Sequence, residues 1–157
     1  MLNATIHTLH VVLAGVWLGG VVFTTAVVSP AFKAMKWGEA ERVEARSVIG
    51  RRFARVGGVN LGLLLVFALL DGLMGGFGTL FYVEYALLLV LFGLVAAHGA
   101  YFGRKLVNLA DAERKAESPE EAASIAEQRR ALQRVSSRVS ILDIAVSVVI
   151  MILAING

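Results

Sequence analysis

Residues 6–20 read IHTLHVVLAGVWLGG, an apolar run with two histidines in its early part. Such a run predicts a helix in a lipid bilayer, where a charged side chain costs roughly 2.5–3.5 kcal/mol at the helix centre. His7 and His10 therefore lie where a chain that enters a membrane should have no polar groups. The alternatives are that they bind a metal, a haem or a proton, or that they contact only each other.

The rest of the chain carries the same membrane signal. Hydrophobic residues make up 57% of its 157 residues, above the roughly 45–50% of a soluble domain. Four apolar runs approach the roughly 20 residues that span a hydrocarbon core, and they cover about residues 4–28, 57–77, 79–102 and 139–155. We therefore expect residues 1–157 to form one all-α integral membrane domain, a bundle of four transmembrane helices. The first run lacks the basic start and cleavage site of a signal peptide, so we expect it to stay in the membrane.

Positive charge predicts the orientation of this bundle. All 15 lysines and arginines fall in residues 29–56 and 103–138, the segments that join the first run to the second and the third to the fourth. The positive-inside rule places both segments in the cytoplasm and both termini outside it, as in a multi-pass protein of the cell membrane. Helical patterning in these segments, and Ser118–Pro119 as a helix start, predict cytoplasmic helical extensions. Pro30 predicts the end of the first helix.

Composition also excludes some classes of function. The chain has no cysteine, which excludes disulfides, thiolate metal sites and cysteine redox chemistry. Its net charge of +3 comes from membrane-proximal segments, so we expect the lipid bilayer as a partner and no nucleic acid. Gly15 and Gly19 form a small-residue face on the first helix, which predicts a homo-oligomer. No nucleophile or nucleotide-binding loop is recognisable, so the sequence leaves open whether the protein is an enzyme.

Polar residues inside the spans fall into two layers when depth is counted at 1.5 Å per residue from the outer helix ends. The shallow outer layer consists of His7, His10, Asp71 and Glu84. The deeper layer consists of Asn60, His98 and Asp143. Helical periodicity puts these residues on one stripe of each helix. The stripes are Asn3, His7, His10, Ala14, Trp17, Val21 and Thr24 on the first helix, Asn60, Leu64, Phe67 and Asp71 on the second, Glu84, Leu88, Leu91, Val95 and His98 on the third, and Ser136, Ser140, Asp143 and Ser147 on the fourth. Because polar residues of membrane proteins face the bundle interior, we expect the stripes to meet there.

The outer layer has the composition of a metal site. Two imidazoles and two carboxylates suit zinc, iron, manganese or copper(II), and helical bundles build metal sites from such side chains. We therefore interpret His7, His10, Asp71 and Glu84 as a candidate cofactor or metal site. One alternative is a path for protons or metal ions through both layers. Another is a structural or assembly protein without a cofactor, in which the histidines are only hydrogen-bonded.

The stretch LHVVLAGVWLGGVVFTTAVVSPAF, residues 9–32, resembles the first helix of three families of small membrane proteins. These are the copper-resistance D group, the bacterial domain related to transmembrane protein 205, and the four-helix membrane protoporphyrinogen oxidase family. The second is the most similar, because VVSPAF and an arginine-rich stretch follow in the same order. The resemblance implies copper or haem at His10. AAHGAYFGRK, residues 96–105, lacks the Trp-Leu-His-x-Lys motif of the oxidases, so no named reaction is implied.

Haem geometry limits how haem b would bind. His10 and His98 differ in depth by roughly 18 Å, and His7 lies on the same side of the same helix as His10, so no two histidines of one protomer can sandwich a haem. A haem here would be five-coordinate, have a second ligand other than histidine, or be shared between subunits. We therefore expect a redox-related membrane metalloprotein that binds haem b or a copper, zinc or iron ion.

Overall fold

The computed structural model of the protein describes residues 1–156, and the side chains of all of these except Lys33, Glu39 and Ala40. Four helices are long and apolar enough to cross a membrane: Leu2–Phe32, Glu41–Gly75, Thr79–Lys115 and Pro119–Asn156. The part of the chain that the structure describes has no strand. The predicted all-α fold with four membrane-spanning helices is therefore confirmed, and the protein is a multi-pass membrane protein.

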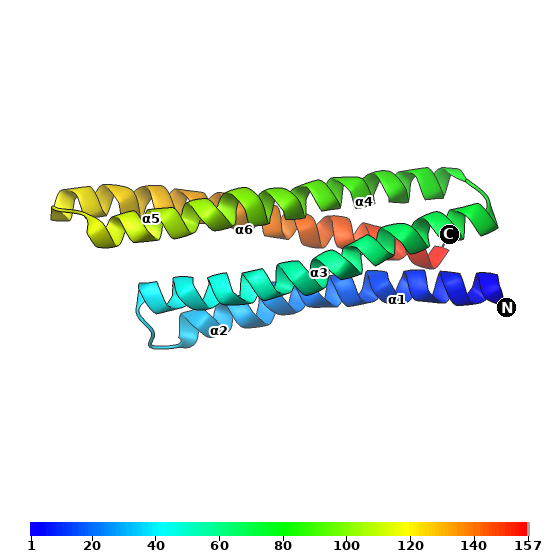
Figure 1. The fold of residues 1–157 in the computed structure, drawn as a ribbon, viewed down its shortest axis with the longest axis horizontal. Coiled ribbons are helices and arrows are strands. Elements are labelled where there is room, and N and C mark those ends of the chain that lie inside the picture. The colour runs from blue at the N-terminus through cyan, green and yellow to red at the C-terminus, as the bar shows by residue number, and fades with distance from the viewer. Residues whose placement is uncertain (157) are drawn as a thin grey trace.

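Two long helical hairpins make up the fold (Figure 1). In the first, α1 (Leu2–Phe23) continues through the π-helical segment η1 (Thr24–Val28) into α2 (Ser29–Ala34), and α3 (Glu39–Gly75) returns beside them. In the second, α4 (Thr79–Ala97), the π-helical segment η2 (His98–Gly103) and α5 (Arg104–Lys115) lead to α6 (Pro119–Asn156). The apolar runs are thus the inner parts of longer helices, and most of residues 29–56 and 103–138 is helical.

The prediction that Pro30 ends the first helix is wrong, because the helix continues to Ala34. The wider turn of η1 comes directly before the proline, and the backbone N–H of Ser29 donates to the carbonyl oxygen of Thr24. The Ser29 hydroxyl donates to the same oxygen at 3.1 Å. Pro30 then lies in the first turn of α2, and the wider turn before it accommodates a residue that has no backbone N–H to donate.

The other turn signals are confirmed. Gly76, at the end of α3, has a φ of 97°, a conformation that favours glycine. At the start of α6 the Ser118 hydroxyl oxygen accepts the Glu121 N–H at 3.1 Å. The Glu121 carboxylate in turn accepts the N–H of Glu117, one residue before the expected partner, at 3.0 Å. Local sequence therefore sets the turn that joins the two hairpins and the turn within the second hairpin.

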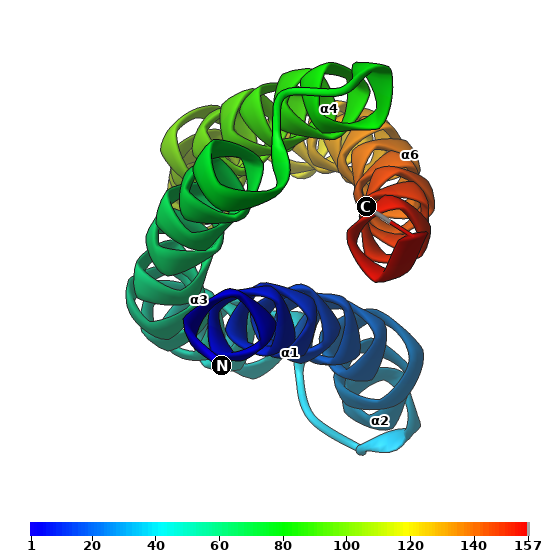
Figure 2. The same ribbon diagram turned by 90° about the vertical axis from the view of Figure 1, so that its right-hand side faces the viewer.

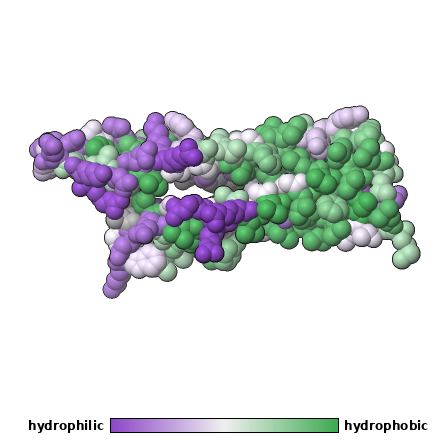
Figure 3. All heavy atoms as spheres, in the orientation of Figure 1, coloured by the Kyte–Doolittle hydropathy of each residue, from purple (hydrophilic) through white to green (hydrophobic). Residues whose placement is uncertain are grey.

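The four long helices form a ring in the order α1, α3, α4 and α6 (Figure 2). Both chain termini lie at one end of the molecule, here called the termini end, and α2, α5 and the start of α3 lie at the other, the extension end (Figure 1). Hydrophobic residues cover the half nearer the termini end, and hydrophilic residues gather over the extensions, where the two hairpins diverge (Figure 3). This distribution fits a membrane-embedded half and an extension beyond it.

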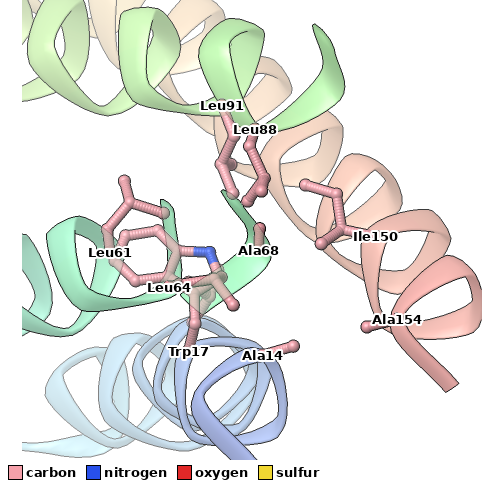
Figure 4. Close-up of a cluster of buried hydrophobic side chains, with 10 residues drawn as sticks. Ala14, Trp17, Leu61, Leu64, Ala68, Leu88, Leu91, Ile150 and Ala154 are labelled. Carbon is pink, nitrogen blue, oxygen red and sulfur yellow. The ribbon is translucent and has the colours of Figure 1, made fainter. Parts of the chain in front are cut away.

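A buried apolar cluster joins all four long helices (Figure 4). It consists of Ala14, Trp17, Val21, Leu61, Leu64, Ala68, Leu88, Leu91, Ile150 and Ala154. Parts of the inward stripes predicted for α1, α4 and α6 are buried, and His10, Glu84 and Asp143 are among these buried residues. On α3 the buried seam is rotated by one residue, so that Asn60 and Asp71 lie half-buried at its edge.

Glycines bring α1 and α3 together, but these are Gly20 and Gly57 and not the predicted Gly15/Gly19 face. A Cβ added at Gly57 of α3 would lie 3.0 Å from the Trp17 ring, and one at Gly20 would lie 3.1 Å from Phe53. By contrast, nothing lies within 4 Å of a Cβ built on Gly19, and Gly15 approaches only the end of Met151. The Gly15/Gly19 face is therefore open within one protomer, and the homo-oligomer stays a prediction.

Core packing predicts that alanine substitutions at two neighbouring leucines differ greatly in their effect on the free energy of unfolding. Leu64 is fully buried, whereas Leu63 is 44% exposed on the outer surface of α3. Leu64→Ala should lower the free energy of unfolding by about 2 kcal/mol or more because it leaves a cavity. Leu63→Ala should change it by less than about 0.5 kcal/mol. Unfolding in mixed detergent micelles measures both, and equal losses would contradict the described core.

Candidate functional site

The structure brings together the four residues predicted for the outer layer. Nδ1 of His7 lies 2.9 Å from Oδ2 of Asp71, and Nδ1 of His10 lies 3.2 Å from the same oxygen. On the other side of the ring, Nε2 of His10 lies 2.9 Å from Oε1 of Glu84. The last contact has ion-pair distance, but its atoms are not aligned as in a good hydrogen bond. We call these four residues the termini-end cluster.

Local sequence explains why these side chains meet. His7 and His10 lie about one turn apart and face the same side of α1. Asp71 lies in the second-last turn of α3 and Glu84 in the second turn of α4. The short Gly76–Gly78 turn joins those two helix ends. The carboxylates therefore reach His10 from two neighbouring helices at the same depth.

The side chains of the cluster differ in exposure between its two halves. The side chain of His7 is 37% exposed, that of Asp71 21%, and those of His10 and Glu84 only 3% and 7%. An open pocket of about 410 Å³ at the termini end is lined by His7 and Asp71, and also by Asn3 and Asn156. The cluster thus has an accessible half and a buried half, joined through Asp71.

Hydrogen-bonding capacity limits the protonation states of this cluster. A neutral imidazole offers one N–H donor, and an ionised carboxylate offers only acceptors. His10 faces a carboxylate oxygen with each of its two nitrogens. The cluster has three contacts between a ring nitrogen and a carboxylate oxygen, and two neutral imidazoles supply only two N–H donors. It therefore needs one further proton or another cation. Two carboxylates face that single extra cation, so an excess of negative charge remains.

The donor chemistry suits a metal ion, but the described arrangement is one of direct contacts. Within residues 1–156, no three histidine, aspartate or glutamate side chains are placed to hold one metal ion. Two imidazole nitrogens nevertheless meet at one carboxylate oxygen of Asp71. Glu84 lies behind His10, in the position of a carboxylate that orients a metal-bound histidine. The donor set thus fits a transition metal if the ion takes the place of the bridging protons.

Haem fits this arrangement less well. A haem iron needs a ring nitrogen that faces open space. His10 is 2% exposed, and a carboxylate oxygen lies near each of its nitrogens. The residues present therefore fit haem b at His10 poorly.

The deeper residues do not form a cluster like the outer ones. Among residues 1–156, no hydrogen bond or ion pair joins Asn60, His98 and Asp143. Asn60 donates from Nδ2 to the backbone carbonyl oxygen of Leu13 at 3.1 Å. Nδ1 of His98 and Oδ1 of Asp143 are buried without a hydrogen-bond partner. In the described arrangement the three deeper residues therefore do not pair with one another.

Two polar contacts were not foreseen from the sequence. Nε1 of Trp17 donates to Oγ of Ser147 at 3.0 Å and links α1 to α6. In the extension, Nε of the buried Arg129 donates to Oε2 of Glu113 at 2.7 Å and links α6 to α5. Periodicity placed Trp17 and Ser147 on inward stripes, but a stripe does not identify the partner of a side chain.

Similarity to known proteins places the chain in a family without an assigned activity. The model of the family described as "Domain of unknown function (DUF4149)" matches residues 12–115. An uncharacterized protein of Aquifex aeolicus (strain VF5) is 33% identical over 100 residues, which cover 62% of this chain and 68% of that protein. No solved structure matches the chain. These findings do not test the three resemblances of the first helix, which stay predictions.

The geometry predicts strong energetic coupling between His10 and Glu84. A double-mutant cycle with His10→Ala and Glu84→Gln should give a coupling energy of about 1–3 kcal/mol. Loss of His10 leaves the Glu84 carboxylate without a partner inside the membrane, and loss of the Glu84 charge leaves Nε2 of His10 without one. Unfolding of the purified single and double variants measures it. His98→Ala with Glu84→Gln is the control and should be additive, since no contact joins those residues. Additivity in both cycles would contradict the described cluster.

Proposed function

This chain belongs to the family described as Domain of unknown function (DUF4149), and we propose that it is a membrane protein that binds a transition-metal cation at its termini-end cluster. One observation carries the proposal: His7 and His10 both direct a ring nitrogen at the same oxygen of Asp71, at 2.9 and 3.2 Å. In the described arrangement each of these two contacts is bridged by its own proton. A metal ion held by both ring nitrogens and by Asp71 would take the place of both protons.

Charge supports the exchange of a proton for a metal ion. The two carboxylates leave the cluster with an excess of negative charge. A divalent cation neutralises this charge more fully than a single proton does. Metal ligands must lose their protons before they bind, so the affinity for metal should depend on pH. The open pocket beside His7 and Asp71 gives an ion from the aqueous phase access to the cluster.

Each residue of the cluster has a distinct role in this proposal. His7, His10 and Asp71 would hold the ion, a set of two imidazoles and one carboxylate that suits iron, copper or zinc. Glu84 would accept the N–H on the far side of His10 and so fix the tautomer and orientation of the ring. A bound iron or copper ion would supply one-electron chemistry, and zinc would polarise a bound water.

A continuous path for ions has less support. The core residues Leu64, Leu88 and Leu91 are fully buried, and along α4 the last two separate Glu84 from His98. An apolar layer without polar partners opposes the passage of a charged ion. The observations therefore favour a binding site that opens to one side.

The orientation of the site follows from charge. All 15 lysines and arginines lie in residues 29–56 and 103–138, and the turns of both segments lie at the extension end (Figure 1). The positive-inside rule then supports a cytoplasmic extension end and an extracytoplasmic termini end in the cell membrane. The cluster would accordingly take its cation from outside the cytoplasm.

Metal binding is tested by calorimetric titration of the purified protein with zinc. We expect one zinc ion per chain, with release of protons. Asp71→Asn and His10→Ala should remove most of the binding, and Glu84→Gln should weaken it about 10–100-fold, the usual effect of losing a carboxylate that orients a ligand. His98→Gln is the matched control and should bind zinc like the wild type.

Two outcomes would overturn the metal proposal. In the first, the wild type binds no zinc across neutral and mildly alkaline pH, which leaves protons as the cations of the cluster. In the second, His98→Gln weakens binding as much as His10→Ala, which places the metal elsewhere.

Topology is tested with introduced cysteines, since the chain has none of its own. Leu2→Cys should react with a membrane-impermeant maleimide in intact cells, because α1 begins at the termini end. Ser118→Cys, at the tip of the second hairpin, should react only after the cells are permeabilised. The reverse pattern would place the cluster on the cytoplasmic side.

A further inference from the structure

Asp143 is the most deeply buried acidic side chain outside the termini-end cluster. It lies on the inward face of α6, is 7% exposed, and its Oδ1 has no hydrogen-bond partner. An ionised carboxylate normally accepts several hydrogen bonds or pairs with a cation when it is buried. Asp143 is therefore a titratable group that the proposed metal site does not use.

The nearest polar groups are already occupied. The Ser147 hydroxyl, one turn further along α6, donates to the backbone carbonyl oxygen of Asp143 at 2.6 Å. The same hydroxyl accepts the N–H of Trp17 at 3.0 Å. Its only proton is thus directed at the backbone and is not available to the Asp143 carboxylate.

Among the side chains that the structure describes, no cation pairs with this carboxylate. None of the ion pairs among residues 1–156 includes Asp143. A titratable group on a neighbouring segment is His98, at the start of η2, which packs against α6. Arg138, five residues earlier on α6, is exposed. Trp17, Val21 and Leu91, buried residues of α1 and α4 beyond the termini-end cluster, carry no charge.

We propose that Asp143 is a proton-binding site of the membrane interior, separate from the termini-end cluster. A protonated carboxyl group is neutral and has a donor of its own, so it can be buried at much lower free energy than a lone carboxylate. Leu88, Leu91 and Ile150 are buried between the two sites. Asp143 therefore exchanges its proton with the extension end and not through His10 and Glu84.

The position of Asp143 links this proton to helix packing. Through Ser147 and Trp17 the backbone at Asp143 is hydrogen-bonded to α1. Loss of the proton leaves a negative charge inside this contact, and the charge must then reach water or a cation. The packing of α6 against α1 is accordingly sensitive to the protonation of Asp143.

Infrared spectroscopy of the purified wild type at neutral pH tests the site directly. We expect a carbonyl band of a protonated carboxylic acid that shifts in heavy water. Asp143→Asn, which keeps the size of the side chain, should remove this band. Asp111→Asn, at an exposed position on α5, should leave it unchanged. Identical spectra of the wild type and Asp143→Asn in the carboxylic-acid region would overturn the proposal.

Tryptophan emission gives a second readout that does not rely on resolving one band. In a Trp37→Phe background, Trp17 is the only tryptophan left. Its emission should change as the pH rises, and Asp143→Asn should abolish that change while His98→Gln keeps it. A pH response that survives in Asp143→Asn would contradict the proposal. Neither readout involves added metal, so both are independent of the outcome of the zinc titration.

Discussion

The imidazole of His10 contacts Asp71 of α3 through Nδ1 and Glu84 of α4 through Nε2. Hydrocarbon offers no water, so these groups have to satisfy one another inside the bundle. One side chain of α1 thereby fixes the depth of three helices relative to one another at the termini end. His7 extends the same set of contacts from Asp71 to the pocket.

Packing below the cluster depends on a different combination of residues. Trp17 fills the space between α1 and α3 beside Leu61 and Leu64 (Figure 4), and Gly57 allows its ring to approach the backbone of α3 closely. Its N–H is satisfied by Ser147 on α6. The same residue therefore closes the apolar core and supplies a polar link across it.

This core divides the polar groups of the membrane half into two environments. On the termini side, carboxylates and imidazoles pair with one another and reach an open pocket. On the extension side, Asp143 and His98 each retain a buried atom without a partner. A partnered cluster can hold a cation with little rearrangement, whereas a lone carboxylate has to change its charge or its surroundings.

Much of this architecture was predictable from the sequence because it is encoded locally. Hydropathy over about 20 residues predicts the number of spans, and a period of 3.6 residues predicts the inward faces. The buried positions His10, Ala14 and Trp17 on α1 and Glu84 on α4 agree with those expectations. Pro30 was misread because the π-helical turn before it depends on backbone hydrogen bonds that residue type alone does not indicate.

The sequence by itself determined the spans, the turns, parts of the inward stripes of α1, α4 and α6, and the shared depth of His7, His10, Asp71 and Glu84. Only the tertiary structure decided that Glu84 lies behind His10 and that Asp71 joins the two histidines. It also decided that Asn60 bonds to Leu13, away from His98 and Asp143. The physical reason is that periodicity specifies which face of a helix is buried. The rotation and axial offset between helices, which choose the partner of each side chain, arise from the packing of the whole bundle.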